Sequence, residues 1–179
     1  CTHLTWVSHV SGKRESRRVV GDYILREQDL TRPIVHEDAT CTTTWRIDQH
    51  YPDPRNADKY PGEEWMSIGV LTPIDFYPLP YRCFYSKDIP NLFMAGRNIS
   101  VSHIALGSTR VMRTCGLIGE VVGMAASICT KKKANPRDVY TTYFEDLKAL
   151  MRKGTGRTDV PYTQFYHQVD RTGHQAEDR

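Results

Sequence analysis

In the first half of the chain, short apolar and β-branched segments alternate with polar and proline-rich stretches, a pattern typical of strands separated by loops. The segments expected to be extended are 2–10, 19–25, 39–47, 73–80, 81–85 and 92–95. Residues 48–75 begin with a run that contains Pro52, Pro54 and Pro61. Because proline interrupts regular structure, this stretch is expected to be an inserted loop.

After residue 107 the pattern becomes helical. Ser108 or Thr109 is the expected N-cap of a helix that runs through Cys129. A second amphipathic helix is expected over 138–153, since apolar residues recur there on one face, and Gly154 ends it. The polar residues that follow are expected to form a tail.

The composition limits the classes of protein to which the chain can belong. With 39% hydrophobic residues in 179, the chain can bury a core. It contains no uninterrupted run of about 18 apolar residues, so no membrane-spanning helix is expected. The net charge of +3 comes from 24 basic and 21 acidic residues, a balance that does not indicate a nucleic-acid partner. We therefore expect neither a membrane nor a nucleic acid among the partners.

The five cysteines form no CxxC pair, so neither a zinc site nor a disulfide scaffold is expected, and no metal ligand is predicted. The chain opens at Cys1 without an initiator Met or an apolar leader. This start favours a chain that begins inside a larger protein, and the modified cysteine of a mature lipoprotein is the alternative. The compartment stays open between cytoplasm and periplasm.

Residues 91–126 carry the candidate chemistry. An apolar segment ends at Gly96, a polar loop follows, and the predicted helix starts at Ser108–Arg110. The free N–H groups and the positive dipole end of such a helix suit an anion or a carbonyl oxygen.

Glycines recur on one side of the same helix, at Gly116, Gly119 and Gly123. Each one costs about 0.5–1 kcal/mol relative to alanine, so the stripe suggests close approach of another backbone. A ligand site and tight packing on a sheet are both compatible with this pattern.

Several segments resemble, in the same order, the C-terminal part of the bacterial FAD-dependent oxidoreductases of the glutathione-reductase-like superfamily. The resembling segments are 12–29, 44–52, 80–86 and 91–126. The resemblance implies an α/β class, here an α+β fragment. Residues 1–90 would be a partial, β-rich substrate domain, 91–130 the last strand, loop and helix of the FAD domain, and 131–179 a helix and tail.

The resemblance implies FAD as the cofactor of the intact parent. The residues it assigns to the cofactor are Gly96, Arg97, Asn98, Gly107, Ser108, Thr109 and Arg110. Arg97 or Asn98 would contact the pyrophosphate or ribityl chain, and the turn from Ser108 would face the flavin pyrimidine. A helix N-terminus there would stabilise the negative charge of reduced flavin.

Four further residues are candidates for chemistry. His103, just before the predicted helix, is the candidate catalytic residue as a proton carrier, and a loop histidine bonded to backbone is an equal alternative. Arg14, Arg18 and Arg82 are candidates for binding a substrate carboxylate or sugar hydroxyl. Salt bridges with nearby acids are the alternative that the charge pattern favours for these arginines.

None of the 12 glycines forms the GxGxxG turn that holds the pyrophosphate in this superfamily. The chain alone is therefore expected to bind FAD weakly or not at all. The function expected of the parent is hydride transfer from a small organic substrate to flavin. A binding module that keeps the fold without cofactor is the alternative, and exposed sheet edges would favour self-association.

Overall fold

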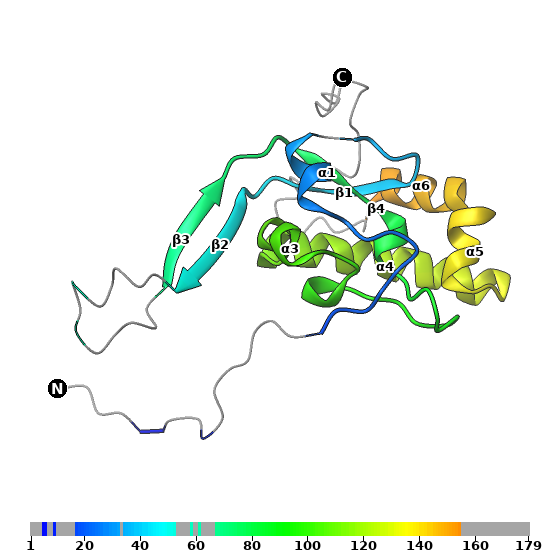
Figure 1. The fold of residues 1–179 in the computed structure, drawn as a ribbon. Helices are drawn as coiled ribbons and strands as arrows, with labels where there is room; N and C mark the ends of the chain where they lie inside the picture. The colour runs from blue at the N-terminus through cyan, green and yellow to red at the C-terminus, as the bar shows by residue number, and fades with distance from the viewer. Residues whose placement is uncertain are drawn as a thin grey trace.

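The computed structural model describes residues 17–32, 34–52 and 67–154, with Thr5, Trp6, His9, Asp58 and Pro61 (Figure 1). Arg14, the strand expected over 2–10 and the predicted polar tail lie essentially outside the described residues. The strands are β1 (Ala39–Thr43), β2 (Ile47–Pro52), β3 (Ser67–Thr72) and β4 (Tyr77–Pro80). The helices are α1 (Glu27–Thr31), η1 (Tyr81–Cys83), η2 (Gly96–Asn98), α3 (His103–Thr109), α4 (Met112–Lys132), α5 (Pro136–Thr141) and α6 (Phe144–Lys153).

The core is built on the antiparallel pair β1–β4, and α4 packs against β1 (Figure 1). Every residue of β1 is buried, and the hydroxyl of Thr40 donates to the carbonyl of Leu79 at 2.6 Å. Threonine suits this position because its branched side chain fits a strand while its hydroxyl finds a buried acceptor.

A single apolar stripe of α4 faces this core. Its buried positions recur every three or four residues, with Leu117 and Ile118 adjacent, and they are Thr114, Leu117, Ile118, Val121, Ala125 and Ile128. Helices α5 and α6 cover the far part of α4, and α6 ends at Gly154, whose φ is 68°. Among the described residues α4 is the one helix long and apolar enough to cross a membrane by length and composition, a test that the core helices of soluble proteins also pass.

The glycine stripe of α4 lies on its other side. A Cβ added at Gly116, Gly119 or Gly123 would meet no described atom within 4 Å. The close approach expected from this stripe is therefore absent within the described part of the chain.

The inserted loop predicted over 48–75 is wrong at 48–52 and 67–72, where the structure has strands β2 and β3. Strands β2 and β3 pair antiparallel in continuous register from Ile47 opposite Thr72 to Pro52 opposite Ser67. The resulting ribbon extends away from the body of the molecule (Figure 1). The strand expected over 39–47 is likewise broken, because β1 ends at Thr43 before β2 begins.

Two other strands predicted from apolar runs are wrong. Residues 81–83 form the 3₁₀ helix η1, and the run 92–95 contributes only an isolated bridge between Phe93 and Tyr85. The strand expected over 19–25 is not continuous, because the chain bends at Asp22 and Tyr23 and forms only an isolated bridge between Leu25 and Val101. Its backbone hydrogen bonds go to several separate segments, among them Asn98, Ser100 and Arg82. The second predicted helix is divided into α5 and α6 near Thr142.

Candidate functional site

The helix predicted to start at Ser108 is α4, which starts four residues later, at Met112. A separate short helix, α3, comes before it. Ser102 caps α3 by accepting the Ala105 N–H at 3.4 Å, and α3 closes where the Arg110 N–H donates to the Leu106 carbonyl at 3.0 Å. Residues 108–110 therefore end one helix rather than begin another. The free N–H groups expected at these residues are instead those at the start of α4.

Ser108 and Thr109 are fully buried at the end of α3. The Ser108 hydroxyl donates to the Trp45 carbonyl at 2.7 Å, and the Thr43 hydroxyl donates to the Ser108 carbonyl at 3.0 Å. The Thr109 hydroxyl has no hydrogen-bond partner among the described residues. Ser108 thus attaches α3 to the end of β1, a structural role that sequence spacing did not indicate.

Gly107 and Arg110 attach α3 to the β2–β3 ribbon. A Cβ added at Gly107 would lie 2.5 Å from the Gln49 Nε2 and 2.7 Å from the Asp48 carbonyl oxygen. Arg110 Nη2 donates to that same carbonyl at 3.2 Å and lies 3.5 Å from the Asp48 carboxylate. The geometry gives these two residues a packing role, and it brings neither to an exposed helix N-terminus.

The exposed helix N-terminus belongs to α4. Val111 is extended, no side chain of the described residues caps the helix, and the first described intrahelical bond runs from the Cys115 N–H to the Val111 carbonyl at 2.9 Å. Met112 is 91% exposed and Arg113 is also exposed. In a helix of 21 residues, the N–H groups of this first turn and the dipole create a local positive potential.

The segment η2 packs beside this N-terminus. Gly96 has a φ of +81°, a left-handed conformation that favours glycine, and a Cβ there would lie 3.9 Å from the Cys115 Sγ. Arg97 and Asn98 are exposed. The structure therefore places η2 beside the start of α4, whose first residues are 111–114 and not the predicted 108–110.

His103 is the first residue of α3 and is exposed, so it lies at a helix start rather than in the loop expected for it. Helix α3 also contacts η2, which brings His103 to the same part of the molecule as Arg97. Its catalytic role remains a prediction.

Arg82 is held inside the fold. Its Nε and Nη2 each lie 3.0 Å from a carboxylate oxygen of Asp38, and its guanidinium lies between the rings of Tyr23 and Tyr140, at 5.4 and 5.1 Å from their centroids. Asp38 is completely buried and raises the pKa of Arg82. The ion pair, the alternative that the charge pattern favoured, is the role that the geometry gives Arg82. Arg18 is half-buried.

His36 lies against the same group of side chains. The centroid of its ring lies 4.6 Å from that of the Tyr23 ring. Its buried Nε2 has no hydrogen-bond partner among the described residues. Burial lowers the pKa of His36, although the carboxylate of Asp38 acts in the opposite direction. The folded state therefore favours the neutral imidazole.

We expect the protein to lose stability as the pH falls through the ordinary histidine pKa of about 6.5. The unfolded chain binds the proton on His36 more readily than the folded chain. The contribution of His36 to the free energy of unfolding is therefore fully present above the ordinary histidine pKa, and it is lost as the pH falls below that value. Thermal unfolding between about pH 7.5 and 5.5 checks this, and His36→Asn should flatten the profile. An equal slope in the variant would contradict the assignment.

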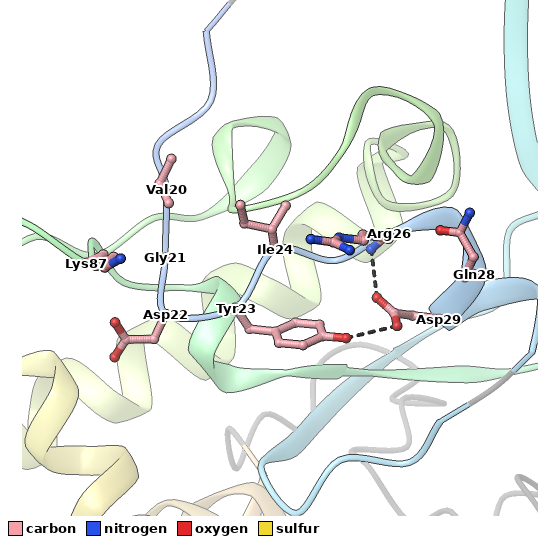
Figure 2. A pocket seen from close by; sticks show the side chains of 9 residues that line it. All are labelled: Val20, Gly21, Asp22, Tyr23, Ile24, Arg26, Gln28, Asp29 and Lys87. Carbon is pink, nitrogen blue, oxygen red and sulfur yellow. Dashed lines mark hydrogen bonds between the residues drawn. The ribbon is translucent and has the colours of Figure 1, made fainter.

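A cavity of about 640 Å³ lies elsewhere, along the backbone from Val20 to Asp29, with Lys87 also lining it (Figure 2). Its lining could not be predicted from the sequence, because Lys87 is far along the chain from the segment between Val20 and Asp29 and joins it only in the folded protein.

The site consists of the exposed N-terminus of α4 beside the glycine turn at Gly96, an arrangement chemically suited to an anionic group. The sequence model of the family described as FAD dependent oxidoreductase matches residues 2–151, and the chain belongs to this family. Separate comparisons with curated proteins and with solved structures find no significant match.

The residues at this site fit the negatively charged part of FAD. Residues 96–98 and 111–115 include the basic residues Arg97 and Arg113 and no acidic residue. Together with the uncapped N–H groups of α4, they form a donor set suited to phosphate or to a flavin carbonyl oxygen.

Proposed function

We propose that this chain is the C-terminal part of a bacterial flavoenzyme of the glutathione-reductase-like superfamily. The parent would transfer a hydride from a small organic substrate to FAD. The observation that carries the proposal is the uncapped, exposed start of α4 beside Gly96–Asn98, in a chain of the FAD dependent oxidoreductase family. Family membership does not favour the alternative of a binding module that has lost its cofactor.

Bound FAD would supply the redox chemistry by accepting two electrons and a proton as a hydride. The chain's own residues would hold and polarise it. The N–H groups of Met112, Arg113 and Thr114 would stabilise negative charge on a bound oxygen, because they have no intrahelical acceptor. Arg97 would neutralise a phosphate or the developing charge from the other side.

His103 would carry a proton at the edge of this site. An imidazole is suited to this because its ring nitrogens can both accept and release a proton. Its place at the start of α3, which contacts η2, supports this part of the proposal.

The experiment uses the intact parent, with any upstream GxGxxG segment, and the 179-residue chain in parallel. The parent should purify with flavin absorbance that bleaches when a substrate is added without oxygen, whereas the chain alone should show little or none. A flavin-free parent, or stoichiometric FAD on the chain alone, would contradict the proposal.

Within the parent, Arg97→Gln and Arg113→Gln should each weaken FAD binding about tenfold, the typical loss when one charge-assisted hydrogen bond to an anion is removed. Fluorescence titration of the apoprotein with FAD measures this. Arg152→Gln, an exposed change in the last turn of α6, is the matched control and should leave the Kd unchanged. Equal behaviour of all three variants would exclude α4 and η2 from the cofactor site.

A further inference from the structure

The β2–β3 ribbon has one covered edge and one open edge. It extends from the body of the molecule as a two-stranded arm (Figure 1). Helix α3 covers the edge of β2, because Gly107 lies against the backbone of Asp48 and Arg110 Nη2 donates to the Asp48 carbonyl at 3.2 Å. Among the described residues β3 pairs with β2 alone, so the other edge of β3 has no partner there.

The contacts of Asp48 also indicate which backbone groups of β3 face outward. In an antiparallel pair the N–H and C=O of one residue point to the same side of the strand, and this direction alternates from residue to residue. Those of Asp48 point to α3, so those of Gln49 point to β3, where Val70 lies opposite. Gly69 and Leu71 therefore direct their N–H and C=O groups away from β2, toward the open edge.

Strand β3 has none of the features that usually protect an exposed edge. Its six residues, Ser67–Thr72, include no charged residue and no proline, and its register with β2 contains no bulge. Val70 is 44% exposed and Leu71 is 49% exposed. Because neighbouring side chains of a strand point to opposite faces, each face of β3 carries an exposed apolar side chain.

A second copy of β3 matches this edge. A strand with a net charge would repel its own copy, and β3 carries no charge that would oppose self-pairing. If Val70 lies opposite Val70 of the second copy, the outward groups of Gly69 face those of Leu71 of that copy. This register forms backbone hydrogen bonds along the edge and covers Val70 of both copies.

We propose that this protein forms a homodimer in which β3 pairs antiparallel with β3 of a second copy. The result is a continuous four-stranded sheet in the order β2, β3, β3, β2. Its outer edges are the two β2 edges, which α3 covers through Gly107 and Arg110. The assembly therefore closes at two copies instead of growing into a fibre.

The dimer is separate from the proposed cofactor site. Neither β2 nor β3 includes a residue of η2 or of the first turn of α4. Dimer formation can therefore be tested without flavin, so its outcome is independent of the proposed function.

Sedimentation velocity of the full chain over a wide range of concentrations tests the dimer. A monomer at low concentration and a dimer at high concentration are expected, with a Kd in the micromolar range because one pair of strands is a small interface. The intact parent should form the same dimer. A chain that stays monomeric, species larger than a dimer, or a monomeric parent whose upstream residues cover β3 would overturn the proposal.

Amide hydrogen exchange distinguishes a second copy from another occupant of the edge. The N–H groups of Gly69 and Leu71 should be exposed to exchange in the monomer and become protected as the dimer forms. Protection of these groups that does not depend on protein concentration would mean that a segment of the same chain covers β3, and the proposal would fail.

Variants assign the dimer to β3. Val70→Lys should raise the Kd of the dimer about tenfold or more, because it places two like charges opposite each other, whereas Val70→Thr keeps a β-branched residue and should retain the dimer. Ile89→Lys is the matched control, since it adds the same charge at a side chain that is 49% exposed and lies outside the ribbon. An unchanged Kd for Val70→Lys, or an equal loss with Ile89→Lys, would exclude β3 from the interface.

Discussion

The Asp38→Ala variant is expected to lose about 3–5 kcal/mol of unfolding free energy, the usual result of removing one partner from a buried ion pair. Asp38 is fully buried and accepts three hydrogen bonds from Arg82, two from the guanidinium and one from the backbone N–H at 2.9 Å. Without it, a guanidinium only 23% exposed would stay between two aromatic rings with no counter-charge.

Urea unfolding of the chain measures this loss. The control is Asp146→Ala, whose carboxylate is 53% exposed and lies 3.6 Å from Lys132. An exposed pair of this kind contributes at most about 1 kcal/mol. A double change of Asp38→Leu with Arg82→Met should be more stable than Asp38→Ala, because no unpaired buried charge remains. Equal losses for Asp38→Ala and Asp146→Ala would contradict the structural role of this pair.

The parts of the fold that the sequence predicted correctly are those with strong local patterns. The body of α4 follows from its apolar stripe, and the end of α6 follows from Gly154. The extended segment 39–43 follows from its β-branched residues. In each of these segments the local preference and the buried face agree, so the pattern along the chain is sufficient.

The break between α3 and α4 could not be predicted in this way. Residues 103–129 are mostly small and apolar, and nothing local separates Arg110 from the helix that follows. At the end of α3 lie contacts with residues distant in sequence, from Ser108 to Trp45, between β1 and β2, and from Arg110 to Asp48 in β2. Those partners are more than 60 positions away in sequence, so the true helix start, and with it the candidate anion site, was displaced by four residues.

The β2–β3 ribbon was missed for a related reason. The prolines between its strands indicated a loop, while the short run Ser67–Thr72 carried the apolar signal of a strand. Pairing with β2 is a long-range property that no local preference reports.

The second large effect is expected for Gly107→Ala, which should destabilise the chain by about 1–3 kcal/mol, the usual range for inserting a methyl group into packed surroundings. The new Cβ would lie 2.7 Å from the Asp48 carbonyl oxygen and 2.9 Å from its backbone nitrogen. Gln49 can move aside only by losing the 2.9 Å bond from its Nε2 to the Ile104 carbonyl, and the backbone of β2 must shift as well. That shift would also lengthen the 3.2 Å bond from Arg110 to Asp48.

Gly116→Ala is the matched control, because it makes the same chemical change in a helix where an added Cβ meets no described atom within 4 Å. It should stabilise the chain by about 0.5–1 kcal/mol, since alanine is the better helix former. Urea unfolding of both variants measures whether each change raises or lowers the free energy of unfolding. Destabilisation by Gly116→Ala would show that another backbone packs on the glycine stripe after all, and a neutral Gly107→Ala would contradict the packing role of Gly107. The pair thus distinguishes a glycine required by packing between α3 and β2 from one required by a partner of α4.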